Sequence, residues 1–123
     1  MSHSTWTGPK VLSLRDRART VDQILAKRFD TLLPQVMRKT GFDMWLIICH
    51  EDNHDPIFNT IIPWACWAPI LQLVVFYDNG SEIERINISR TNMQGLMPSS
   101  PWNPDREEDQ WACLRSLLKT LAQ

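Results

Sequence analysis

An uncharged apolar run from Met44 to Cys49, followed at once by a dense polar cluster, constrains the fold of this chain more than any other feature. Six consecutive apolar residues do not alternate with polar ones, so they suit a β-strand that is covered on both faces. The next six residues, 50–55, include two histidines and three carboxylates. Because strand ends are where α/β sheets commonly place functional residues, this loop is the first candidate site.

The segment before this strand predicts a long amphipathic helix. Apolar residues recur at helical spacing from position 14 to position 36. Pro34 cannot lie deep inside a continuous helix, but it fits the first turn of a new helix that Thr31 caps. We therefore expect a helix from Ser13 to about Asp30, then a kink or break, and a second helix that Gly41 ends.

The segment after the strand predicts an antiparallel hairpin. Residues 71–77 and 82–90 read as strands, and Asp78-Asn79-Gly80 between them is a strong turn signal. Ile83 is out of phase with the apolar residues that follow it, which predicts a bulge near residues 84–85 or a late start to the pairing.

Two further helices are indicated by a capping residue followed by proline. Asp55-Pro56 predicts a short helix at 57–62, and Asn103-Pro104 predicts the start of the last helix. The apolar side of that last helix is expected to hold Trp111, Leu114, Leu118 and Leu121.

Composition indicates one globular domain. The chain has 123 residues, 43% hydrophobic and 22% charged, with a net charge of -1. Residues 1–40 carry eight Lys/Arg and three Asp/Glu, whereas residues 41–80 carry no Lys/Arg and five Asp/Glu. The basic residues Arg15, Arg17 and Arg19 are interleaved with the apolar stripe, which favours a solvated helix face over a nucleic-acid site. Nucleic-acid binding would require salt-sensitive binding through these arginines.

Neither membrane insertion nor secretion is expected. Residues 56–77 carry no charge, but Pro63 and Pro69 would break a spanning helix and no Lys/Arg flanks it. The first ten residues lack the apolar core of a signal peptide. Three cysteines in apolar surroundings indicate reduced core residues, so we expect a cytoplasmic protein.

The letters His50-Glu51-x-x-His54 match the zinc-protease motif, in which two histidines one turn apart hold the metal and the glutamate acts as base. The motif requires a helix, and here it directly follows a strand and is cut short by Pro56. A looser metal site at these histidines and carboxylates stays open, as does a solvated loop that caps the next helix. A small metal-dependent hydrolase is therefore the alternative function.

A loop bracketed by Pro63 and Pro69 carries Trp64 and Trp67. Two large aromatic residues in an irregular loop are either core residues or anchors of a contact surface.

The order of these features resembles the N-terminal domain of the creatinase, prolidase and Xaa-Pro aminopeptidase family. The resemblance covers the chain from about Val11. It rests on Arg28-Phe29-Asp30-Thr31-Leu32-Leu33-Pro34, on Gly41-Phe42-Asp43-Met44-Trp45-Leu46-Ile47-Ile48, on Glu51-Asp52-Asn53-His54-Asp55-Pro56-Ile57-Phe58, and on the hairpin, Ser89-Arg90 and Gln110-Trp111 downstream.

The resemblance implies a three-layer α/β domain at 11–123, after a flexible arm at 1–10. A small mixed sheet with an antiparallel hairpin would be flanked by helices. In that family catalysis belongs to a C-terminal pita-bread domain, in which two Asp, one His and two Glu hold a pair of manganese, cobalt or zinc ions. That domain is not part of this sequence, so no catalytic residue or cofactor is expected here, and the chain reads as a fragment, a truncated product or a free-standing domain.

The resemblance also implies a role in assembly. Such N-terminal domains pack in dimers or larger oligomers and limit a neighbouring active site to short peptides. The residues expected to make these contacts are His54, Phe58, Trp64 and Trp67. An unpaired sheet edge, expected if the domain is incomplete, also favours dimerisation. Whether the parent cleaves Xaa-Pro bonds or a creatine-like substrate stays open.

Overall fold

The computed structural model describes residues 11–53, 55–64, 66, 68, 70–93, 95–106 and 109–122. Its helices and strands follow the order expected for an α/β fold. They are α1 (Leu14–Lys27), the π-helix η1 (Arg28–Leu32), α2 (Leu33–Thr40), β1 (Met44–His50), α3 (Phe58–Ile61), β2 (Leu71–Asp78), β3 (Ile83–Ile88), the 3-10 helix η2 (Pro104–Arg106) and α4 (Gln110–Leu121).

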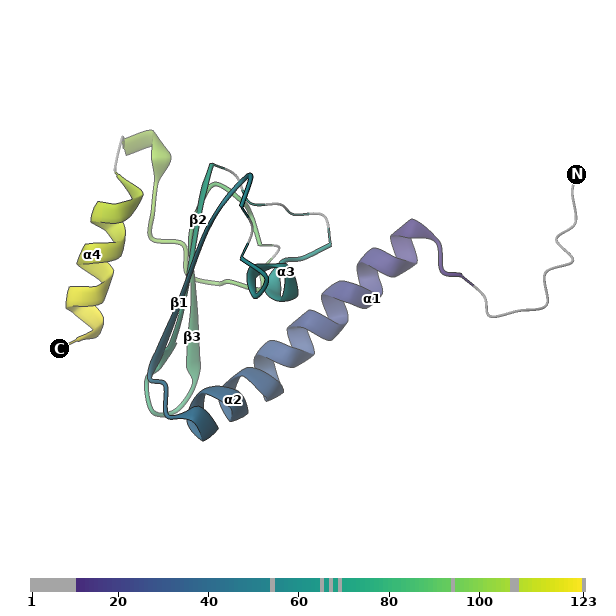
Figure 1. The fold of residues 1–123 in the computed structure, drawn as a ribbon, viewed down its shortest axis with the longest axis horizontal. Coiled ribbons are helices and arrows are strands. Elements are labelled where there is room, and N and C mark those ends of the chain that lie inside the picture. The colour runs from purple at the N-terminus through teal and green to yellow at the C-terminus, as the bar shows by residue number, and fades with distance from the viewer. Residues whose placement is uncertain are drawn as a thin grey trace, which may run out of the picture.

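The three strands form one sheet in the order β1-β2-β3, and both pairs are antiparallel. The expected hairpin of β2 and β3 is confirmed. The expected mixed sheet is not found among the described strands, where the parallel element is an isolated bridge between Ile86 and Ser99. In Figure 1 the helices α1 and α3 lie on one side of the sheet and α4 lies on the other, which makes three layers.

Of the kink or break expected at Pro34, the break is not found, because the helical segments α1, η1 and α2 follow one another directly. A π-helical turn, η1, precedes the proline, and the Leu33 N–H donates to the Arg28 carbonyl. Proline has no N–H, and its ring crowds the carbonyl four residues earlier, so one widened turn lets the helix continue. Thr31 does not cap a new helix, because its hydroxyl donates to the Lys27 carbonyl at 2.7 Å.

Both ends of this helical unit follow the sequence prediction. The Ser13 hydroxyl accepts the Asp16 N–H at 3.2 Å at the start. Gly41 ends α2 with φ 77, a left-handed conformation that glycine adopts without steric cost. The first turns of α1 extend beyond the sheet (Figure 1), and their side chains are exposed.

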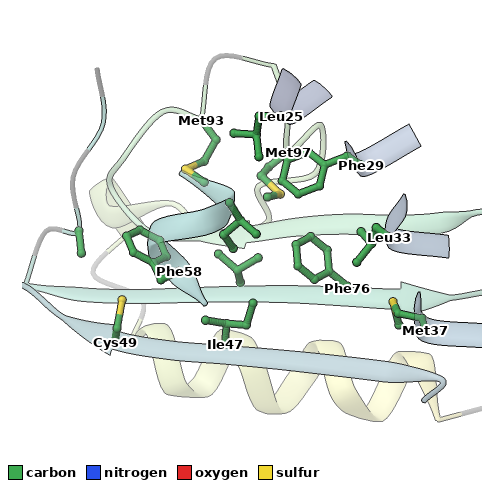
Figure 2. Close-up of a cluster of buried hydrophobic side chains, with 13 residues drawn as sticks. Leu25, Phe29, Leu33, Met37, Ile47, Cys49, Phe58, Phe76, Met93 and Met97 are labelled. Atoms are coloured by element: carbon green, nitrogen blue, oxygen red, sulfur yellow. The ribbon is translucent and has the colours of Figure 1, made fainter. Parts of the chain in front are cut away.

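One face of the sheet carries the odd-numbered residues of β1 and β3 and the even-numbered residues of β2. We call it the helix face. It is covered by α1, η1, α2, α3 and the residues Met93, Leu96 and Met97 (Figure 2). Phe76 and Phe29 lie at its centre, with their rings 5.6 Å apart. The buried residues are Leu25, Phe29, Leu33, Met37, Ile47, Cys49, Phe58, Ile61, Ala68, Val74, Phe76, Met93 and Met97.

The opposite face, which we call the α4 face, is covered by α4. Its buried residues are Leu71, Leu73, Val75, Ile86 and Ile88 on the strands and Cys113 and Leu114 on the helix. The Gln110 amide anchors the start of α4 by donating to the carbonyls of Leu71 at 3.0 Å and Ile88 at 2.9 Å.

Neither the predicted bulge near residues 84–85 nor a late start to the pairing is found, because the β2–β3 register is continuous from Leu73↔Ile88 to Asp78↔Ile83. Ile83 is out of phase since it packs on the helix face, whereas Ile86 and Ile88 pack on the α4 face. A strand with apolar layers on both sides has no single apolar phase.

The last helix begins later than predicted. Asn103 caps only the short helix η2, by accepting the Asp105 N–H at 3.0 Å. Asp109 caps α4 by accepting the Trp111 N–H at 3.3 Å. Trp111 is exposed rather than on the apolar side, whereas Leu114, Leu118 and Leu121 contact the α4-face core as expected.

Candidate interaction surface

An apolar groove lies beside β1 on the described surface. Three hollows of about 180, 300 and 260 Å³ run along the N-terminal helical unit. Neighbouring hollows share lining residues: Leu25, Arg28 and Thr60 join the first two, and Val36 and Trp45 join the last two. They therefore form one continuous groove, which we call the β1 groove.

One wall of the β1 groove is a second apolar stripe on the helical unit. The first stripe, Leu25, Phe29, Leu33 and Met37, is buried in the core. The second stripe lies one residue earlier at three of these four levels, where it consists of the exposed residues Ile24, Leu32 and Val36, and Arg28 occupies the fourth level. A helix that packs on one sheet needs one apolar stripe, so the second is available for another contact.

The opposite wall comes from β1 and the segments next to it. Trp45 and Ile61 line the central hollow. Phe42, Met44 and Leu46 line the hollow at the start of β1, and Phe42 is largely exposed. The groove thus reaches the open side of the first strand.

Trp64 is hydrogen-bonded to α1 beside Val21, which lines the smallest of the three hollows. The Trp64 N–H donates to the Asp22 carboxylate on α1 at 2.9 Å, and the Trp64 residue is 47% exposed. Trp64 therefore lies at the surface, and its role as a contact residue stays a prediction. Trp67 and His54, two other expected contact residues, lie outside the described residues.

Phe58 differs from the surface role expected of it. It is 0% exposed and packs in the helix-face core, close to Cys49 and Met93 (Figure 2). The reason is local, because Asp55 accepts the Ile57 N–H at 2.8 Å and turns the chain into α3, whose apolar side meets the sheet.

The polar strand end does not have the backbone that the zinc-protease motif requires. His50 is the last residue of β1, and Glu51 and Asp52 form a turn closed by hydrogen bonds between the backbones of His50 and Asn53. The His50 ring lies at 3.0 Å from the Ile70 carbonyl, and the Glu51 and Asp52 side chains are exposed. Within the described ranges, no three His, Cys, Asp or Glu side chains gather in a group suited to hold a metal ion.

The cysteines also lack the setting of a nucleophile. Cys49 and His50 point to opposite faces of β1, as expected for adjacent strand residues. Burial raises the pKa of the Cys49 thiol, and burial likewise raises the pKa of Cys66, whose thiol lies at 3.1 Å from the Asn92 carbonyl. A raised pKa disfavours the thiolate, which is the reactive form.

The basic residues on α1 form a solvated helix face. Arg15, Arg17 and Arg19 are exposed. Arg19 lies 3.9 Å from the Asp16 carboxylate, and the Arg17 guanidinium donates to the Leu12 carbonyl. These contacts are local, as predicted for side chains that face water.

Searches against protein-family models, curated proteins and solved structures find no match to this chain. Among the residues that the structure describes, none of the helices combines the length and the apolarity that crossing a bilayer requires.

Sequence reasoning missed most of the β1 groove. The contact residues expected from the sequence were His54, Phe58, Trp64 and Trp67, and they did not include the groove residues Leu32, Val36 and Phe42. The signal that was present is the width of the apolar stripe on the first helix, which exceeds what one buried face requires.

Proposed function

We propose that this chain is a non-catalytic contact domain similar to the N-terminal domain of Xaa-Pro aminopeptidases and prolidases. In this proposal the β1 groove forms a contact between two copies of the chain. Trp64, which is hydrogen-bonded to α1 beside the groove, helps to restrict a partner active site to short peptides. The metal pair of such peptidases would belong to their catalytic domain and not to this chain.

The observation that carries the proposal is the continuity of the groove. Its three hollows extend from Ile24 on α1 to Leu46 on β1, and apolar residues line most of their length. A contiguous apolar surface of this kind is typical of an interaction site, because leaving it in water is unfavourable. At the polar strand end, by contrast, the Glu51 and Asp52 side chains are exposed to solvent.

The resemblance supplies the class of parent protein, and the element order supports it. A helical unit, a strand, a short helix and an antiparallel hairpin follow one another at the positions on which the resemblance rests. Packing between copies is the role that such domains have in that family.

The proposal is tested by measuring mass and activity on the purified chain. We expect a dimer by light scattering and no hydrolysis of Xaa-Pro peptides with added Mn²⁺, Co²⁺ or Zn²⁺. Val36→Glu places a charge in the groove and should shift the protein to monomer. Gln35→Glu adds the same charge at an exposed neighbour and should leave the dimer intact.

One outcome would favour the alternative function instead. If the chain hydrolyses peptides only with bound metal, and His50→Ala abolishes this activity, the chain is a small metal-dependent hydrolase and the contact-domain proposal is wrong.

A further inference from the structure

The two edges of the sheet differ in how their backbone groups are satisfied. Asp43 accepts the Asp78 N–H at 2.9 Å, so the odd residues of β1 direct their backbone groups toward β2. In an antiparallel pair the direction alternates along the strand. The N–H and C=O groups of Met44, Leu46 and Ile48 therefore point away from the sheet.

The β3 edge is occupied. Its outward groups belong to the odd residues, and Ser99 pairs with two of them. The Asn87 N–H donates to the Ser99 carbonyl at 2.8 Å, and the Ser99 N–H donates to the Arg85 carbonyl at 3.4 Å. A segment distant in sequence thus protects this edge, as native sheets commonly require.

The β1 edge has no such cover within the described part of the chain. Only its end is closed, because the outward groups of His50 pair with Asn53 in the adjoining turn. The strand lacks the usual protective residues, since Met44–Cys49 contains no charge and no proline.

A strand added to this edge would bury side chains on both faces. On the helix face it would lie against the hollow lined by Val36, Phe42 and Trp45. On the α4 face it would lie beside Ile48, which is 38% exposed. The added strand must therefore be apolar on both sides, and β1 itself meets this requirement.

We propose that β1 pairs antiparallel with β1 of a second copy across a two-fold axis at Leu46, so that two three-stranded sheets become one. This inference rests on the proposed function, since it names the pairing through which two copies associate. Leu46 faces Leu46 of the second copy, and Met44 faces Ile48. All outward groups of these three residues are then hydrogen-bonded.

Charges and backbone pairing favour an axis at Leu46 over an axis at Ile47, which is the next possible register. With the axis at Leu46, Asp43 faces Cys49 of the second copy, and no like charges meet. With the axis at Ile47, Asp43 would face Glu51, and the outward backbone groups of Met44 would face those of His50, which already pair with Asn53. Like charges directly opposite each other are destabilising in a sheet.

A proline at position 46 tests the backbone pairing. The Leu46 N–H is not used between β1 and β2, so Leu46→Pro should retain the fold by circular dichroism, as proline is tolerated at a free edge. It should weaken dimerisation about ten- to a hundredfold, because two hydrogen bonds per dimer are lost. Leu46→Ala keeps the N–H while removing the same side-chain contacts, so it is the matched control and should dimerise more tightly than Leu46→Pro.

Crosslinking tests the register and does not depend on the proline variant folding. Facing residues in a hydrogen-bonded antiparallel pair have Cα atoms about 5.5 Å apart, within reach of a disulfide. Leu46→Cys should therefore form a covalent dimer on mild oxidation, whereas wild type and Ile48→Cys should not. Crosslinking of Ile48→Cys without Leu46→Cys would overturn the register.

The outcomes separate this inference from the proposed function. The edge pairing is overturned, and the contact-domain proposal is retained, if the chain is a peptidase-inactive dimer that Val36→Glu dissociates but Leu46→Pro does not weaken and Leu46→Cys does not crosslink. A chain that is monomeric at every concentration overturns both, and metal-dependent hydrolysis overturns the proposed function.

Discussion

The helix face and the α4 face are built on the same three strands, yet they are covered to different extents. The helix face meets a helical unit that runs without interruption from Leu14 to Thr40, together with α3 and the residues Met93, Leu96 and Met97 (Figure 1). The α4 face meets one helix of 12 residues. On β1 the contrast appears between neighbours, since Ile47 is 3% exposed on the helix face and Ile48 is 38% exposed on the α4 face.

The difference shows how coverage by helices decides which strand of a sheet keeps exposed side chains. A helix is about 10 Å wide and strands are spaced nearly 5 Å apart, so a single helix covers about two strands well. Helix α4 is tied to β2 and β3 through Gln110, which leaves β1 less covered. The outer strand on that side is therefore the one available to a partner.

The largest expected effect is at the centre of the helix face. Phe76→Ala removes a ring that is 0% exposed and contacts Phe29 and Trp45. It should lower the free energy of unfolding by about 3–5 kcal/mol, because it leaves a cavity as well as removing apolar contacts. Urea denaturation followed by circular dichroism measures the loss. A loss under about 1 kcal/mol would show that this face is not the main core.

The matched pair Ile47→Ala and Ile48→Ala isolates the difference between the faces within one strand. We expect a loss of about 2–4 kcal/mol for the buried Ile47. For the exposed Ile48, measured on monomer at low concentration, we expect less than about 1 kcal/mol. Equal losses in urea titrations would contradict the contrast in coverage.

Gln110→Ala tests what holds α4 in place. It removes the donor to the Leu71 and Ile88 carbonyls and should cost about 1–3 kcal/mol, since buried carbonyls lose their partner. Gln35→Ala, at an exposed position on α2, should stay within about 0.5 kcal/mol of wild type. Faster amide exchange across α4, with β1 unchanged, would support the anchoring role, and unchanged exchange in α4 would refute it.

The smallest effect is electrostatic and concerns the hairpin end of the helix face. Hydrogen bonding from Arg38 at 3.1 Å, together with the Gly80 N–H, holds the pKa of Asp78 below its ordinary value of 3.8. A lowered pKa contributes stability that is present above the ordinary value and is lost as pH falls through the folded-state pKa.

Arg38→Ala should therefore raise the pKa of Asp78 toward 3.8 in an NMR titration of its carboxyl group. The difference in free energy of unfolding between wild type and variant should shrink as the pH falls below about 4, because the Asp78 carboxyl group then becomes protonated in both proteins. Lys39→Ala, at the adjacent exposed position, is the control and should leave the pKa of Asp78 unchanged.

The sequence by itself determined the local elements, because each is encoded by neighbours in the chain. Gly41 marks the end of α2, Asp78-Asn79-Gly80 marks the hairpin turn, and the apolar run at 44–49 marks β1. Where two local rules conflicted, the packing of distant segments decided the outcome. Pro34 lies in a widened turn rather than at a break, and Ile83 pairs without a bulge since an apolar layer covers each face of its strand.

Only the tertiary structure decided what is buried and what is left open. Phe58 and Trp64 are both aromatic residues near the same loop, yet one is in the core and the other is at the surface. The openness of the β1 edge depends on where α4 and Ser99 lie, and both are distant from β1 in the chain. Residue type sets what a side chain favours, but exposure depends on all the segments that pack around it, so no single stretch of sequence specifies it.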